Sequence, residues 1–156
     1  MEYLRAGDII SGQEAKAYLR LDGENQLMFY AKKLTATAVK EKLGVKTLGK
    51  RGTQYKTNGW SGSGEMTIYY ATSAFRKLMC DYMKNGVDVT FDIQVINEDP
   101  ASTIGAQDVT LTGCNLNSVL MTAFDVDSDS LSETVQFTFE GVTMAESFGM
   151  PELGDA

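Results

Sequence analysis

Alternating acidic residues at positions 125–130 (DVDSDS) form the first pattern in the sequence that could bind a metal ion. Carboxylates at alternate positions open many calcium-binding loops, where they converge on one hard cation. The rest of that pattern is missing, because Ser130 stands where glycine is needed and Gln136 where a bidentate glutamate is needed. The flanking sequence also favours strands rather than the two helices of such a motif. We therefore interpret residues 125–130 as a solvated turn, and the sequence predicts no metal and no cofactor.

Groups suited to other chemistries are equally sparse. The chain contains no histidine, which removes the commonest general base. Cys80 and Cys114 are too far apart for a CxxC redox or zinc motif, so we expect free, buried thiols. The glycine-rich residues 59–64 (GWSGSG) lack the Lys-Ser/Thr ending of a phosphate-binding loop and precede a strand. The sequence predicts no catalytic residues, and we do not expect an enzyme.

The positions of these residues depend on predicted strands. Alternation of apolar and polar residues, or a high content of strand-forming residues, indicates strands at 14–22, 26–39, 65–71, 87–95, 107–116, 119–126 and 131–142. The first two are expected to form a hairpin around residues 22–25, and the last two a closing hairpin around residues 127–130. In the last strand Val135, Phe137 and Phe139 are expected to face the core, and a bulge is expected at Gly113.

One helix is expected between an N-cap at Ser73 and a stop at Gly86. Its apolar residues follow the helical period, which predicts that Phe75, Leu78 and Tyr82 lie against the sheet. The fold class is thus mainly β (α+β), an antiparallel β-sandwich or partly closed barrel with one flanking α-helix and a long protruding loop.

Length and composition indicate a single domain spanning residues 1–156. The chain of 156 residues is 43% hydrophobic and 22% charged, values that exclude a disordered or collagen-like protein. The opening residues lack the apolar stretch of a signal peptide, and no run approaches the length needed to cross a bilayer. We therefore expect a cytoplasmic protein that does not insert directly into membranes.

Charge is distributed very unevenly along the chain. The net charge of −7 divides into 14 basic and 8 acidic residues before position 85, and 13 acidic residues with no basic residue after it. Residues 32–56 alone contain eight cations and one acid, Glu41. Most of these cations fall in residues 40–64, where the strand period disappears and glycines accumulate, which predicts a long loop or a protruding, irregular hairpin.

This basic segment could be a nucleic-acid site, a subunit contact or merely a solvated loop. Nucleic-acid sites usually combine cations with a helix or interleaved aromatics, and the acidic remainder of the chain would repel phosphates. A basic arm on an acidic body better fits a second copy of the chain, through a contact that closes into rings or continues as filaments. Trp60 fits equally an anchor in that contact or a core residue. The candidate interface residues are Lys40, Lys42, Lys46, Lys50, Arg51, Lys56 and Trp60.

The outward positions of the later strands carry Thr, Gln and acids, with no cation. Such a face repels DNA along its whole length, which is what a channel for DNA requires. The candidate lumen-facing residues are Asp88, Asp92 and Glu140.

Four segments, taken in order and spacing, resemble a known family. They are residues 6–12 (AGDIISG), 60–70 (WSGSGEMTIYY), 75–79 (FRKLM) and 135–141 (VQFTFEG). Together they are similar to the tail tube proteins of contractile phage tails, specifically those of PBSX-like defective prophages and related phage-tail-like bacteriocins of Firmicutes.

The resemblance implies a structural protein that self-assembles into stacked hexameric rings, the inner tube of a contractile tail. The implied partners are other copies of the chain together with tail sheath and baseplate proteins. DNA would pass through the lumen without specific binding, or the tube would puncture a membrane. The protein would be assembled in the host cytoplasm and then reside in the virion or phage-tail-like particle. The alternative is a small β-rich nucleic-acid-binding module that uses the Lys/Arg-rich loop.

Overall fold

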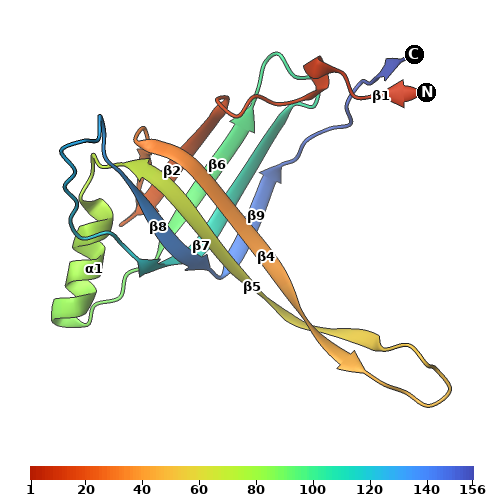
Figure 1. The fold of residues 1–156 in the computed structure, drawn as a ribbon, viewed down its shortest axis with the longest axis horizontal. Helices are drawn as coiled ribbons and strands as arrows, with labels where there is room; N and C mark the ends of the chain where they lie inside the picture. Colours follow the sequence, from red (N-terminus) through yellow and green to blue (C-terminus); the bar gives the residue numbers. More distant parts are fainter.

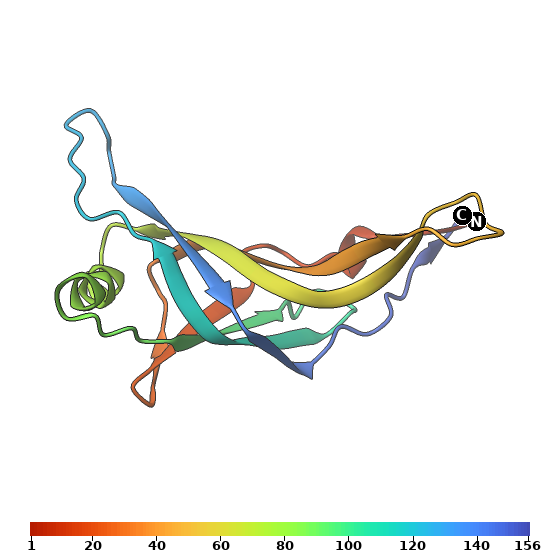
Figure 2. The ribbon, with the colours of Figure 1, turned by 90° about the horizontal axis from the view of Figure 1, so that it is seen from below.

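Two antiparallel layers enclose the core of the computed structural model, which describes residues 1–156 (Figure 1). Sheet I has the order β3-β2-β6-β7-β9, and sheet II the order β7-β8-β5-β4. Figure 2 shows the two sheets one above the other, with α1 at one end. The predicted sandwich with one flanking helix is confirmed. The elements are β1 (Glu2–Tyr3), β2 (Ala15–Leu21), β3 (Glu24–Leu27), β4 (Ala31–Val45), β5 (Gln54–Tyr69), α1 (Ala74–Asn85), β6 (Phe91–Glu98), β7 (Ala106–Ser118), β8 (Ser132–Phe139), β9 (Gly141–Glu146) and β10 (Gly154–Asp155).

Strand β7 belongs to both sheets. Its first part pairs with β6 and β9, whereas its last residues pair with β8. The change occurs at Gly113, whose φ of +64° lies in the left-handed region that glycine adopts without a Cβ penalty. The register against β6 shifts at the same place, so the predicted bulge is confirmed. At this bulge the single eight-stranded sheet folds over, so that its two parts face each other as the two layers of the sandwich.

The core lies between the inner faces of the two sheets. Alternate residues of β8, Val135, Phe137 and Phe139, are buried as predicted. They meet a cluster that includes Ile93 of β6 and Met66 of β5. Each large apolar side chain removed from water stabilises the fold by about 1.5–3 kcal/mol.

Helix α1 packs on the sandwich with only part of its apolar stripe. The helix spans the predicted residues and ends at Gly86, whose N–H donates to the carbonyl of Tyr82. Ser73 makes no side-chain cap, and the hydroxyl of Thr72 accepts from the N–H of Ala74 instead. Phe75 is buried and Leu78 is half-buried against the core, but Tyr82 is 54% exposed. The prediction that Tyr82 lies against the sheet is therefore wrong.

Several predicted strands differ from the structure: 65–71 is the end of the longer β5, and 131–142 is divided into β8 and β9. Residues 26–39 do not form one strand: β3 ends at Leu27 in sheet I and β4 begins at Ala31 in sheet II, with Met28 and Tyr30 buried between them. The strand expected at 87–95 begins only at Phe91. Residues 119–126 form no strand, since β8 finds its partners in β5 and β7 rather than in a closing hairpin.

The two ends of the chain are joined through the buried carboxylate of Asp8. It accepts hydrogen bonds from the Thr103 hydroxyl at 2.6 Å, the Arg5 N–H at 2.9 Å and the Leu153 N–H at 3.2 Å. The Thr103 hydroxyl contributes most, followed by Arg5, to holding the pKa of Asp8 well below its usual value, although burial opposes the shift. The charged form of Asp8 therefore stabilises this junction.

We expect the benefit of Asp8 to disappear in acid. Because its folded pKa lies below the unfolded value of 3.8, its contribution is complete above that value and is lost as the pH falls below it. Asp8→Asn should therefore destabilise the protein at about pH 6, and the gap to wild type should shrink towards about pH 2. Urea unfolding across this range measures the gap, with the exposed Asp129→Asn as control. A gap that stays constant with pH would contradict the assignment.

Candidate subunit interface

The seven candidate interface residues all lie on one projection, which we call the basic arm (residues 40–60), whereas residues 62–64 of the predicted segment pair with β8 in the sandwich. The arm is the distal part of the β4–β5 hairpin, in which Lys42 pairs with Thr57 and Val45 with Gln54. It extends well beyond the sandwich (Figures 1 and 2). Only residues 46–53 lie between the two strands, so the segment is the protruding hairpin rather than a structureless loop. A bulge between Lys40 and Lys42 provides the expected irregularity.

The charge of the arm is not neutralised within the chain. The four ion pairs of the structure join Met1 to Asp155, Arg5 to Asp8, Arg5 to Glu152 and Arg76 to Glu133. None of them involves an arm cation, and all six arm cations are exposed. Their positive field is therefore directed to solvent or to another molecule.

Trp60 stands at the base of the arm and is 46% exposed. Its ring centroid lies 6.0 Å from that of the buried Phe139. One side of the indole thus contacts the sandwich core while the other remains open, and Lys40 faces it in register on β4. Trp60 is therefore partly packed on the core, and its open side leaves it available as the predicted contact residue.

The outer face of sheet II is a polar surface built from three strands. Register pairs Thr35 with Glu65, and Glu65 with Gln136. Thr37, Ser63 and Thr138 form the next row. From the sequence, only the β8 part of this face was expected, because Ser63 falls in the segment interpreted as a glycine-rich loop and the pairing of β4 with β5 beside β8 was not predicted.

The three candidate lumen residues come from different places but meet at the corner of the sandwich. Glu140 directly follows β8, Asp92 lies on β6, and Asp88 precedes β6. Asp92 accepts from the N–H of Gly113 at 3.3 Å, and Asp88 accepts from the Asn115 amide at 2.8 Å. The N–H of Glu140 donates to the carbonyl of Thr112. All three acids therefore adjoin residues 112–115, where β7 passes between the sheets.

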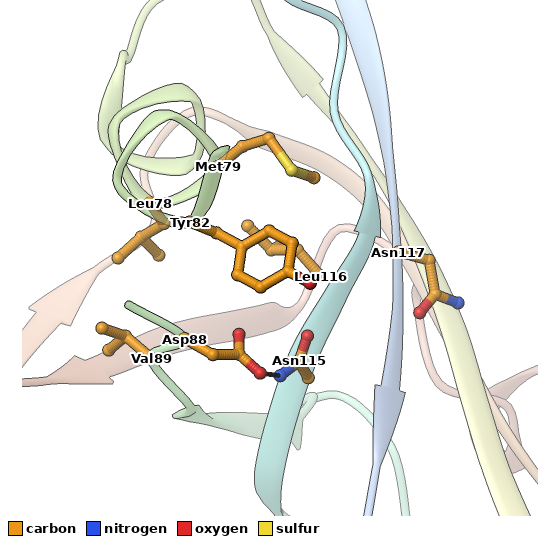
Figure 3. Close-up of a pocket in the computed structure, with 8 residues that line it drawn as sticks. All are labelled: Leu78, Met79, Tyr82, Asp88, Val89, Asn115, Leu116 and Asn117. Carbon is orange, nitrogen blue, oxygen red and sulfur yellow. Dashed lines mark hydrogen bonds between the residues drawn. The ribbon is translucent and has the colours of Figure 1, made fainter. Parts of the chain in front are cut away.

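Beside this corner, the exposed part of α1 leaves a hollow against β7, shown in Figure 3. We call it the α1 hollow. Tyr82 extends over it from the helix, and the hydrogen-bonded pair Asp88–Asn115 lies on the opposite side. The lining residues are Leu78, Met79, Tyr82, Asp88, Val89, Asn115, Leu116 and Asn117.

A buried ion pair fixes the helix to sheet II. Arg76 Nη1 lies 2.5 Å from Oε2 of Glu133, whose residue is only 3% exposed. The guanidinium also stacks on the ring of Tyr70, with 4.4 Å to the ring centroid, and donates to the carbonyls of Thr72 and Leu120. This pair holds together the helix, β8 and the segment that precedes β8.

Side chains suited to metal binding or catalysis do not cluster in the rest of the structure. The structure contains no cluster of three or more metal-ligating side chains. In the acidic turn, the N–H of Asp127 donates to the Asp125 carboxylate, which is a local turn bond. Burial raises the pKa of the Cys114 thiol to about 12, so it remains protonated and unreactive. No helix combines the length and apolarity needed to cross a bilayer.

Comparison with known proteins shows where this architecture occurs. The family described as "Phage tail tube protein" matches residues 2–146. The chain is 41% identical over 143 residues to phage-like element PBSX protein XkdM of Bacillus subtilis (strain 168), covering 92% of this chain and 95% of that protein.

Two solved structures share the fold at low sequence identity. The sheath/tube terminator of the extracellular contractile injection system PVC has a TM-score of 0.69 at 11% identity, covering 88% of this chain and 97% of its own. The SPP1 tail tube has a TM-score of 0.61 at 15% identity, covering 92% and 81%. The sandwich agrees with these folds, and the family matches nearly the whole of this chain. The chain therefore belongs to the phage tail tube protein family.

Proposed function

We propose that the chain polymerises into stacked hexameric rings that form the inner tube of a contractile tail or phage-tail-like particle. The role is structural rather than catalytic. The basic arm carries the proposal. Its six exposed cations form no ion pair within the chain, and every charged residue after position 84 is acidic. An arm that meets the body of a second copy makes a heterologous contact, the kind that generates rings and tubes.

The free edge of sheet II supports this proposal. Strand β4 pairs only with β5, so its 15 residues present unpaired backbone groups along the other edge. A long open edge is a template for pairing with another chain. The tail sheath and baseplate are the further partners that we propose for the tube.

The outer face of sheet II is our candidate for the channel wall. Its Thr, Ser and Gln side chains are uncharged, and Glu65 and Glu140 repel a polyanion. The cations of this face, Lys32 and Lys33, are confined to the start of β4. Asp92, at the sandwich corner, extends the same negative charge. A mainly uncharged and acidic wall of this kind gives DNA few points of attachment, and it serves a membrane-puncturing tube equally well.

Purified full-length protein should form rings and tubes when concentrated in about 0.1 M salt, where charges within about 10 Å still interact. Electron microscopy and sedimentation measure the assembly, and a map of the tube shows whether the outer face of sheet II lines the channel. Monomers alone at high concentration, in low and moderate salt, would contradict the proposal. If those monomers retarded DNA in gels, the nucleic-acid-binding alternative would be favoured instead.

A further inference from the structure

The α1 hollow has the character of a receptor for one apolar side chain. It has a volume of about 230 Å³ and five of its eight lining residues are hydrophobic. Leu78 and Met79 line it from the helix, and Val89 and Leu116 line it from the segment before β6 and from β7. Next to it, Tyr82 and Met83 leave 54% and 59% of their surface exposed at the end of the helical stripe. An apolar stripe that continues past the intramolecular contact leaves a surface open to a partner.

The same end of the molecule carries negative charge. Asp81 lies on the helix and Asp88 lines the hollow. The segment between β7 and β8, which contacts α1 through Arg76 and Leu120, adds Asp125, Asp127 and Asp129. Three exposed cations, Lys77 and Lys84 on the helix and Lys32 stacked on Tyr69, oppose these five acids, while the charge of Arg76 is engaged by Glu133. The partner of this end should therefore be cationic as well as apolar.

The tip of the basic arm has both properties. Leu48 is fully exposed between β4 and β5, and Lys46, Lys50 and Arg51 flank it. The tip is an ordered turn, in which the Gln54 amide donates to the Thr47 hydroxyl at 3.0 Å. A single exposed leucine is ordinary on a protein surface. Here, however, the leucine lies among three cations, and the same chain carries an apolar hollow among acids. The arm tip and the α1 hollow are therefore complementary in both apolarity and charge.

The two features lie at opposite ends of the long axis, with α1 at one end and the arm tip at the other (Figure 2). An arm cannot reach the hollow of its own subunit, so the complementary surfaces can meet only between copies. We infer that Leu48 of one subunit inserts into the α1 hollow of the next, with Lys46, Lys50 and Arg51 facing Asp81 and Asp88. The inference rests on the proposed polymerisation, and it assigns Asp88 to a subunit contact rather than to the channel wall.

Cysteine cross-linking tests this contact in the full chain. Leu48→Cys and Val89→Cys are combined in a Cys80→Ser background, which leaves only the buried Cys114 as a native thiol. A short bis-maleimide should link the assembled variant into a ladder of covalent oligomers on a denaturing gel. The matched control places the first cysteine at Leu27, an exposed leucine of β3 outside the arm.

Because Val89→Cys alters the lining of the hollow, a second variant tests the contact from the arm side alone. Leu48→Asp should raise the protein concentration needed for assembly about tenfold or more, as expected for a central contact residue, whereas Leu27→Asp should not. Tubes that yield no ladder, or that form normally with Leu48→Asp, would overturn the pairing and leave the tube proposal intact. Failure of the unmodified protein to form tubes would instead overturn the proposed function, and this inference with it.

Discussion

Exchanging Lys46, Lys50 and Arg51 together for Glu is expected to abolish tube formation while the subunit stays folded. The three reversals change the net charge of the basic arm from +5 to −1. An arm that was attracted to the acidic body of a neighbour would then be repelled by it, and unfavourable like-charge contacts cost several kcal/mol. Each 1.4 kcal/mol is a tenfold loss of affinity, so assembly should disappear at accessible concentrations.

Folding should be spared because all three side chains are exposed and lie outside the core cluster. Sedimentation and electron microscopy measure assembly, and thermal unfolding measures the fold. The charge-conserving exchange Lys46→Arg, Lys50→Arg and Arg51→Lys serves as control and should assemble. Normal assembly of the Glu variant would show that the arm is not an interface, and a much lower melting temperature would show that the arm is part of the fold.

Arg76→Ala is expected to lower the free energy of unfolding by about 3–5 kcal/mol, the range for breaking a buried ion pair. Glu133 is 3% exposed, and its Oε1 already lacks a hydrogen-bond partner. Removing the guanidinium would leave the whole carboxylate buried without compensation. The variant would also lose the stacking of Arg76 on Tyr70.

Urea unfolding measures this loss. The exposed neighbour Lys77→Ala should change stability by no more than about 0.5 kcal/mol. The double variant Arg76→Met with Glu133→Leu should recover most of the stability, because apolar residues can replace a buried ion pair. A loss well below 1 kcal/mol for Arg76→Ala would mean that Glu133 finds solvent or another donor.

Local residue patterns predicted those helices and strands that can be recognised without knowing which other element they pack against. The helical spacing of Phe75 and Leu78 predicted α1, and the alternation of Val135, Phe137 and Phe139 predicted the buried face of β8. Strand pairing was harder to predict, because alternation shows which face of a strand is buried but not which distant strand pairs with it. The closing hairpin was wrong for this reason, since residues 119–126 are mostly apolar, as in a buried strand, but pair with no other strand.

Glycine was the second source of error. The glycines of residues 59–64 were taken as signs of a loop, yet β5 runs through them. A side chain at Gly64 would approach the ring of Phe137 to 2.5 Å, and one at Gly62 would collide with Phe139. These residues are glycine because the core rings need the space, which is a tertiary requirement. The pattern therefore concealed a strand and much of the polar face.

The candidate site was partly within reach of the sequence. Exposed cations in residues 40–64 followed from composition alone, and their placement on one projection is what the structure adds. The Arg76–Glu133 pair was missed because the two residues are far apart in the chain. A signal existed, since Glu133 continues the alternation of Val135 and Phe137 onto the buried face.

The long hairpin also has a consequence for the order in which the chain folds. Strands β4 and β5 are joined across residues 46–53, and closing such a short loop carries a small entropic cost. Pairing of β5 with β8 joins residues 63 to 77 positions apart, and contacts of that separation form more slowly. Hairpins form within about 1–10 μs, so the arm is complete before β8 closes the body that must receive it. We therefore expect the arm to be structured before the body against which, in the proposed assembly, the arm of a neighbour would pack.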